Sequence, residues 1–140
     1  MLDGVLGLMR GIRSLPLGWQ MWVHSLAGVN MVLPLFFWGR PEATWTLAAF
    51  AAGFFTGALL VRRQGFTRLL GLMHVFWLPL LVWLWGRLLL VPADEPFGLW
   101  LRVLFLMNTI SLLIDAVDVG RYLRGERKPV ARAQGQAGLL

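Results

Sequence analysis

Four long apolar stretches dominate this sequence and leave little freedom in how the chain can fold. A helix of about 20 apolar residues crosses the hydrocarbon core of a bilayer, because lipid offers backbone groups no hydrogen-bond partner. Hydrophobic residues make up 58% of the 140-residue chain and charged residues only 14%, too few polar groups to cover a soluble domain of this size. These features exclude a soluble enzyme and a disordered chain, and they predict a membrane protein.

The apolar runs predict an all-α fold, a polytopic four-transmembrane-helix bundle. The second run is the shortest, and Ala43 and Thr44 can extend it. Pro34 and Pro79 lie inside the first and third runs and are expected to bend those helices, because each removes a backbone N–H. The predicted spans are residues 17–38, 45–61, 69–91 and 97–119.

The basic residues flank the predicted spans unevenly. Most of them lie in the segments on one side of the membrane, and the other side holds only Arg40 with three acidic residues. Arg87 and Arg102 lie near span ends. Since short cytoplasmic loops collect arginine and lysine, we expect a bacterial inner-membrane protein with both termini in the cytoplasm. The net charge of +6 then favours anionic lipid headgroups as partners, rather than nucleic acid. The basic side carries Arg10, Arg13, Arg62, Arg63, Arg68, Arg121, Arg124, Arg127, Lys128 and Arg132.

The segments outside the spans also follow from sequence patterns. Residues 1–16 place apolar side chains at helical spacing beside Arg10 and Arg13, which predicts an N-terminal interfacial amphipathic helix on the cytoplasmic side. Pro16 ends this helix before the first span begins. Residues 17–119 then form the bundle, and residues 120–140 form a cytoplasmic basic tail.

A stripe of small residues in the second span predicts a close helix contact. Ala49, Gly53 and Gly57 follow one another at intervals of four residues, which lets another backbone approach. The partner is either a helix of the same chain or a second copy in a homodimer. The stripe suits both uses equally.

Three ionisable residues are predicted to form a layer in the cytoplasmic leaflet. At about 1.5 Å per helical residue, His24 lies about 10 Å, His74 about 7–8 Å and Asp115 about 6 Å from the cytoplasmic ends of their spans. Gln20 and Thr56 fall near the same level. Ionisable groups inside a membrane turn toward the bundle interior, so each is a candidate site residue.

The fourth span carries the most informative pattern in the chain. Asn108, Ser111, Asp115, Asp118 and Tyr122 are spaced alternately three and four residues apart, so all five lie along one helix face. Such a stripe is expected to face protein or water. Asn30 and Asn108 both fall near the midplane, where an amide pair between helices would contribute about 0.6–2 kcal/mol.

Two hypotheses for this layer involve no cofactor. In the first, Asp115 pairs with a histidine or with Arg121 to fix helix register, and the chain is a non-enzymatic structural or accessory protein, alone, as a homo-oligomer or in a membrane complex. In the second, the layer lines an inward-facing cavity of a small proton- or cation-coupled transporter or channel. The candidate ligand- or ion-binding residues are His24, His74, Asn108, Ser111, Asp115 and Asp118.

A third hypothesis is metal-centred. His24 and His74 at matching depth on separate helices meet the minimum geometry for the axial ligands of haem b. A zinc site of these histidines with Asp115 is chemically allowed but needs a fourth ligand or water. The chain has no cysteine, no H-E-x-x-H sequence and no phosphate-binding loop, so an enzyme is the less expected class.

Overall fold

The described part of the chain is built from helices. The computed structural model describes residues 1–130, so Arg132 and the predicted tail from residue 131 onward lie outside it. Residues 1–130 contain no strand, which confirms the all-α prediction for this part of the chain. The elements are α1 (Leu2–Arg13), α2 (Leu17–Ala27), the π-helix η1 (Gly28–Val32), the 3₁₀-helices η2 (Leu33–Phe37) and η3 (Arg68–His74), α3 (Pro41–Gln64), α4 (Trp77–Leu88) and α5 (Pro96–Leu123).

Two helices, α3 and α5, are long and apolar enough to cross a membrane. η3 and α4 meet at 43° and supply a third such segment if they count as one bent helix. A membrane protein is therefore supported by two to three helices of sufficient length and composition. Both long helices extend past the predicted spans, since α3 begins at Pro41 rather than residue 45 and α5 ends at Leu123 rather than residue 119.

The two proline-containing runs are helical but not uniformly α-helical. The first run passes from α2 to π at Gly28 and to 3₁₀ at Leu33, with Pro34 as the second residue of η2. The third run is 3₁₀ up to His74, and its α-helix begins at Trp77, two residues before Pro79. A proline cannot donate to the preceding turn and clashes with it, so a regular α-helix is disfavoured just before each. The 43° angle confirms the expected bend of the third run.

A tryptophan satisfies the carbonyl that Pro34 leaves open. In a π-helix the Val29 carbonyl would accept from the residue five positions later, which is Pro34 and has no N–H. Trp100 Nε1 donates to this carbonyl over 3.0 Å instead. The irregular backbone of η1 is thus tied directly to α5.

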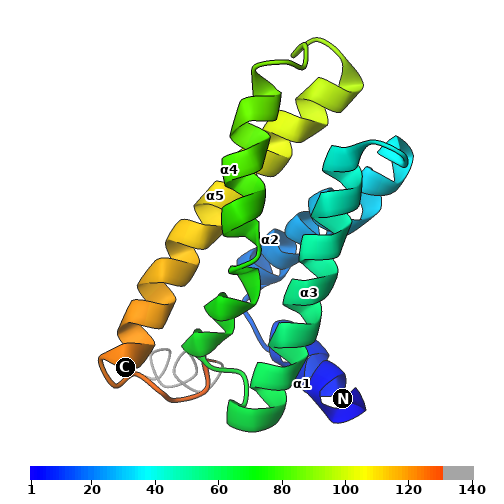
Figure 1. Cartoon of the computed structure of the whole chain (residues 1–140). Coiled ribbons are helices and arrows are strands. Elements are labelled where there is room, and N and C mark those ends of the chain that lie inside the picture. The colour runs from blue at the N-terminus through cyan, green and yellow to red at the C-terminus, as the bar shows by residue number, and fades with distance from the viewer. Residues whose placement is uncertain (131–140) are drawn as a thin grey trace.

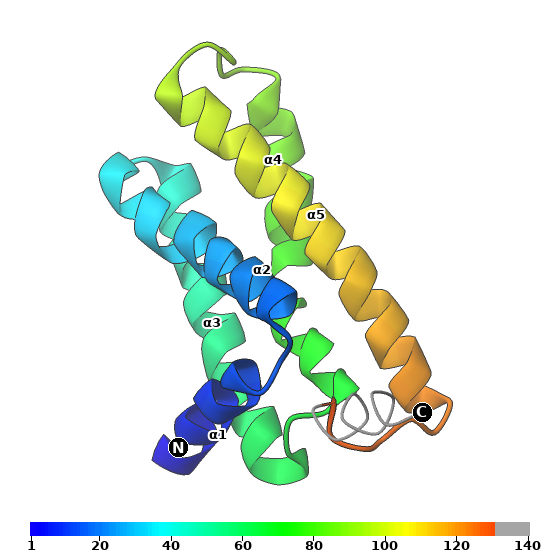
Figure 2. The ribbon, with the colours of Figure 1, turned by 180° about the vertical axis from the view of Figure 1, so that it is seen from behind.

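The turns η2–α3 and α4–α5 lie at the end of the bundle opposite to α1 and the end of α5 (Figure 1). The turn from η2 to α3 and the turn from α4 to α5 lie at one end (Figure 1). α1, the turn from α3 to η3 and the end of α5 lie at the other, as the view from behind also shows (Figure 2). We call these the turn end and the terminal end. The terminal end carries most of the arginines.

An apolar core fills the bundle from its middle to the turn end. Phe37 stacks on Trp100 with ring centroids 5.1 Å apart and meets Phe97 edge-on at 5.3 Å. These rings close the space between the first segment and α5. The buried core residues are Leu26, Val29, Ala43, Trp77, Leu80, Leu81, Leu84, Phe97, Trp100, Leu101 and Leu104.

α1 is held against the terminal end of α3 by glycines. Gly4, Gly7 and Gly11 turn toward Ala58, Val61 and Phe66, and a Cβ on any of the three would collide with its neighbour. Leu8 is buried in the same contact, whereas Leu2, Leu6 and Met9 stay exposed. The predicted interfacial segment is therefore a helix with one face docked on the bundle and one apolar face free of the described chain.

The small-residue stripe of α3 packs mainly within the chain. A Cβ on Gly53 would lie 2.5 Å from the carbonyl oxygen of Met73, and one on Gly57 would lie 3.1 Å from the Met73 side chain. These two glycines let η3 approach α3. Ala49 instead lines an apolar groove between α3 and α4, next to Trp45 and Trp83.

Candidate functional site

The polar stripe of α5 meets a different neighbour at almost every turn. At its buried end, Asn108 and Asn30 exchange two hydrogen bonds of 2.8 Å, and neither side chain is exposed. Asn30 also donates to the Leu26 carbonyl at 3.0 Å. The amide pair expected from the sequence is thus formed, between η1 and α5. Ser111, one turn further along the stripe, is buried as well.

Asp115 pairs with one of the predicted histidines. Its Oδ2 lies 2.7 Å from Nδ1 of His74, and the two side chains are 16% and 20% exposed. The His74 ring stacks on Trp77 with centroids 4.1 Å apart. Gly71 permits the contact, because a Cβ there would lie 2.9 Å from the Cβ of Asp115. η3 and α5 therefore come together backbone to backbone beside the pair.

The stripe continues toward the terminal end as an ion-pair network. Arg68 on η3 pairs with Asp118 and also lies 3.3 Å from Glu126. Arg121 donates to Glu126, 2.8 Å away at the closest, rather than to Asp115. The hydrogen bond from Arg121, aided by the charges of Arg121 and Arg68, holds the pKa of the Glu126 carboxyl below its ordinary value.

The last residue of the polar stripe of α5, Tyr122, forms a hydrogen bond to the second apolar segment. Tyr122 Oη donates to Gln64 Oε1 over 2.6 Å, which joins α5 to the end of α3. Gln20 and Thr56, which were predicted near the level of the ionisable residues, bond only to nearby backbone carbonyl groups. Gln20 donates to the Leu15 and Arg13 carbonyls and so closes the turn between α1 and α2, and Thr56 bonds to the Ala52 carbonyl of its own helix.

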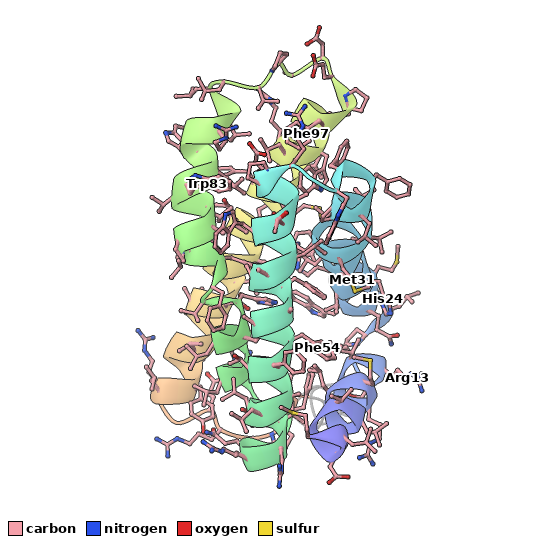
Figure 3. The ribbon with its side chains drawn as sticks, turned by 45° about the vertical axis from the view of Figure 1, so that its right-hand side comes forward. Arg13, His24, Met31, Phe54, Trp83 and Phe97 are labelled. Atoms are coloured by element: carbon pink, nitrogen blue, oxygen red, sulfur yellow. The ribbon has the colours of Figure 1, made fainter. Side chains whose placement is uncertain are left out.

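His24 does not belong to this layer, which corrects the sequence-based prediction. Its side chain is exposed, and Nδ1 lies 2.6 Å from the Gln20 carbonyl oxygen of its own helix. Figure 3 shows His24 on the side of α2 that faces away from α3. The prediction rested on residue number and did not consider the rotation of the helix. Leu26 takes the buried face, and a residue two positions earlier points about 200° away from it.

The metal-centred hypotheses lose their geometric basis with His24. Axial haem ligands must face one another across a shared pocket, whereas His24 faces outward and His74 is occupied by Asp115 and Trp77. Across residues 1–130, no three His, Cys, Asp or Glu side chains are grouped so that they could hold a metal ion. The residues present therefore fit neither haem b nor the proposed zinc site.

A buried ion pair at the turn end was missed from the sequence. Glu42, with no exposed surface, accepts from Arg87 Nε at 2.6 Å, and its Oε2 has no partner within the described chain. The predicted second span begins at residue 45 and therefore leaves Glu42 outside it. Pro41 followed by an acidic residue is, however, a typical first helical turn, and that signal predicts α3 to begin there.

Arg102, which lies near the end of a predicted span, caps backbone carbonyl groups. Its guanidinium donates to the Leu88 and Val91 carbonyls at 3.1 and 3.0 Å, and to Gly98 at 3.0 Å. These bonds close the turn between α4 and α5. At the turn end, Arg102 thus serves local structure, whereas the Glu42–Arg87 pair joins α3 to α4.

Comparison of the chain with protein-family models, curated proteins and solved structures gives no match.

Proposed function

We propose that this chain is a non-enzymatic integral membrane protein with a structural or accessory role, in which the polar stripe of α5 fixes the register of the bundle. One observation carries the proposal. The stripe bonds to the first apolar segment through Asn30, to the second through Gln64 and to the third through His74 and Arg68. Polar pairs of this kind hold helices together in lipid, where apolar contacts supply no hydrophobic driving force.

The proposal includes four membrane crossings with both termini in the cytoplasm. α3, α5 and the bent η3–α4 pair account for three. The first segment stays helical from Leu17 to Phe37 through α2, η1 and η2, which at roughly 1.5 Å per residue gives a length of about 30 Å, matching the hydrocarbon core. Placing the arginine-rich terminal end in the cytoplasm of a bacterial cell satisfies the positive-inside rule.

The arrangement favours this role over that of a proton- or cation-coupled carrier. The candidate ion-binding groups Asp115 and Asp118 already pair with His74 and Arg68. Beyond Asn108 toward the turn end, the interior is filled by buried apolar side chains such as Leu101 and Leu104. A carrier needs polar contacts along a path that reaches both sides, and the polar stripe stops at mid-bundle.

Single-cysteine labelling tests the topology. The natural chain contains no cysteine, so each introduced thiol is the only one to react. We expect Ala93→Cys, in the α4–α5 turn, to react with a membrane-impermeant maleimide in intact cells lacking an outer-membrane barrier. Ser14→Cys, in the α1–α2 turn, should react only after permeabilisation. Labelling of both residues from the same side would contradict four crossings.

The role itself is tested with Asp115→Asn. A structural role predicts that the variant unfolds at lower temperature in detergent, and that proteoliposomes of the natural chain pass protons no faster than empty liposomes. Glu95→Gln, an exposed change at the start of α5, is the matched control and should melt like the natural chain. Proton flux through the natural chain that disappears in a folded Asp115→Asn protein would instead establish the carrier.

A further inference from the structure

A second apolar groove lies between α2 and α5 on the terminal half of the bundle. It is an open groove of about 530 Å³, a volume similar to that of small-molecule sites. Its walls are two indoles from α2 and two isoleucines from α5, and Pro16 and Gly18 line it where α2 begins. The lining residues are Pro16, Gly18, Trp19, Trp22, Ile110 and Ile114.

The groove lies on the terminal side of the junction between η1 and α5. Asn30 bonds to Asn108 and the Val29 carbonyl accepts from Trp100, so α5 is fastened to η1. On the terminal side of that junction, the groove separates the start of α2 from residues 110–114 of α5. No side chain fills the space beside Gly18, where a Cβ would have no neighbour within 4 Å.

The charges near the start of α2 favour an anionic occupant. Within the described residues, Asp115 already pairs with His74, Asp118 with Arg68 and Glu126 with Arg121, so none of these three carboxylates is paired with Arg13. Arg13 is exposed, ends α1 three residues before Pro16, and forms no ion pair within residues 1–130. Figure 3 shows Arg13 beside the start of the first segment.

The groove between α3 and α4 provides the contrast. It has nearly the same volume, about 550 Å³, and an equally apolar lining that includes Trp45 and Trp83. One turn beyond these residues, Glu42 and Arg87 neutralise each other. Volume and apolarity are therefore shared by the two grooves. They differ in that Arg13, near the α2–α5 groove, forms no ion pair within residues 1–130, whereas Arg87, near the α3–α4 groove, is paired with Glu42.

We infer that the α2–α5 groove binds an anionic phospholipid of the cytoplasmic leaflet. One acyl chain lies along Trp19, Trp22 and the two isoleucines, and the phosphate lies toward Arg13. Indole rings suit this level of the bilayer, because their apolar face meets the chain and their N–H meets the headgroup. The inference rests on the proposed function, since it requires that the terminal end lie at the inner headgroups.

Tryptophan quenching in nanodiscs tests the site. The full chain is placed in phosphatidylcholine nanodiscs containing the same fraction of either dibrominated phosphatidylglycerol or dibrominated phosphatidylcholine. We expect stronger quenching by the brominated phosphatidylglycerol. Arg13→Gln should weaken its apparent affinity about fivefold, the effect of one basic residue at an anionic surface.

Gly18→Leu separates the groove from general charge attraction. This change fills the groove and alters no charge, so it should abolish the excess quenching by phosphatidylglycerol. Gly86→Leu is the matched control, because Gly86 is also an exposed helical glycine with open space around its Cβ, but lies on α4. Its quenching should equal that of the natural chain.

Two results would overturn the inference: equal quenching by both brominated lipids, or an unchanged excess in Gly18→Leu. Nanodiscs offer both leaflets the same lipids, so this readout does not depend on orientation in the cell. A failure of the topology proposal would be seen in cysteine labelling alone, and a failure of the lipid site in quenching alone.

Discussion

The two ends of the bundle are held together by different interactions. Toward the terminal end, α5 bonds to its neighbours through polar pairs such as His74–Asp115 and Arg68–Asp118. Toward the turn end, the same helix packs through stacked rings, and one buried pair, Glu42–Arg87, joins α3 to α4. In lipid, helices gain from close packing and from polar contacts but not from burying apolar surface. α5 therefore uses polar contacts toward the terminal end and close packing of rings toward the turn end.

The largest effect is expected from breaking the pair at the turn end. Arg87→Met leaves the fully buried Glu42 without its hydrogen-bond donor. Removing one partner of a buried pair typically costs about 3–5 kcal/mol, and the partial exposure of Arg87 favours the lower end. The free energy of unfolding, measured by titrating a denaturing detergent into mixed micelles, should fall by about 3 kcal/mol.

The matched double change separates the lost pair from lost packing. Glu42→Leu combined with Arg87→Met removes both charges and should restore most of the stability, because an apolar pair can replace a buried ion pair. If Arg87→Met alone were as stable as the natural chain, Glu42 would have to be satisfied by another group, and the pair would not hold this end together.

The next effect comes from the closest backbone contact at the terminal end. In Gly71→Ala the new Cβ would lie 2.9 Å from the Cβ and 3.1 Å from the Cα of Asp115, so η3 must move away from α5. Overpacking of this kind costs about 1–3 kcal/mol. The same detergent titration should show the loss, and the fluorescence of Trp77, which stacks on His74, should change with it.

Gly86→Ala is the control for this substitution. Gly86 lies in α4 with nothing near its Cβ, so alanine there should leave the stability unchanged or raise it slightly. Equal behaviour of the two alanine variants would show that η3 tolerates displacement, and that the polar pairs do not require the close approach.

A smaller effect is expected from the amide pair at the junction of the two regions. Asn108→Ala leaves the buried Asn30 amide without its interhelical partner, which should cost about 1 kcal/mol. Asn30→Leu combined with Asn108→Leu should cost less than Asn108→Ala, because no buried polar group is then left unpaired. If the double change were the more damaging, the pair would act through shape rather than hydrogen bonding.

Residue number predicted which polar residues of different segments can meet, but not which way each side chain points. His74 meets Asp115 and Asn30 meets Asn108, and the stripe of α5 faces protein as its spacing predicts. His24 was misjudged, although a signal was available. Asn30 was expected to face inward, and a residue six positions earlier lies about 120° from it on an α-helix. Comparing the angular positions of Asn30 and His24 around the helix would have excluded His24 from the layer.

Other features depend on contacts between distant segments. Gly4, Gly7 and Gly11 share a face of α1 at visible spacing, but that they dock on α3 follows only from the tertiary arrangement. The π-helix at η1 likewise depends on Trp100, which supplies a donor to the carbonyl left open by Pro34. Periodicity describes one helix at a time, so it cannot reveal a partner that supplies a missing hydrogen bond.

The smallest effect concerns the exposed pair at the terminal end. The pKa of Glu126 is lowered chiefly by its hydrogen bond from Arg121, so the folded chain holds this carboxyl ionised to a lower pH than the unfolded chain does. The stabilisation is therefore complete above the ordinary glutamate pKa and is lost as pH falls through the lowered value. Melting temperatures of the natural chain and Glu126→Gln should differ slightly at pH 7, converge in acid, and differ less in high salt, because both side chains are solvent-exposed. Asp94→Asn, which removes an acid of the α4–α5 turn, should show no such convergence. A difference at pH 7 as large as that of Arg87→Met would mean that solvent-exposed pairs contribute as much as the buried one, and the contrast between the two ends would not hold.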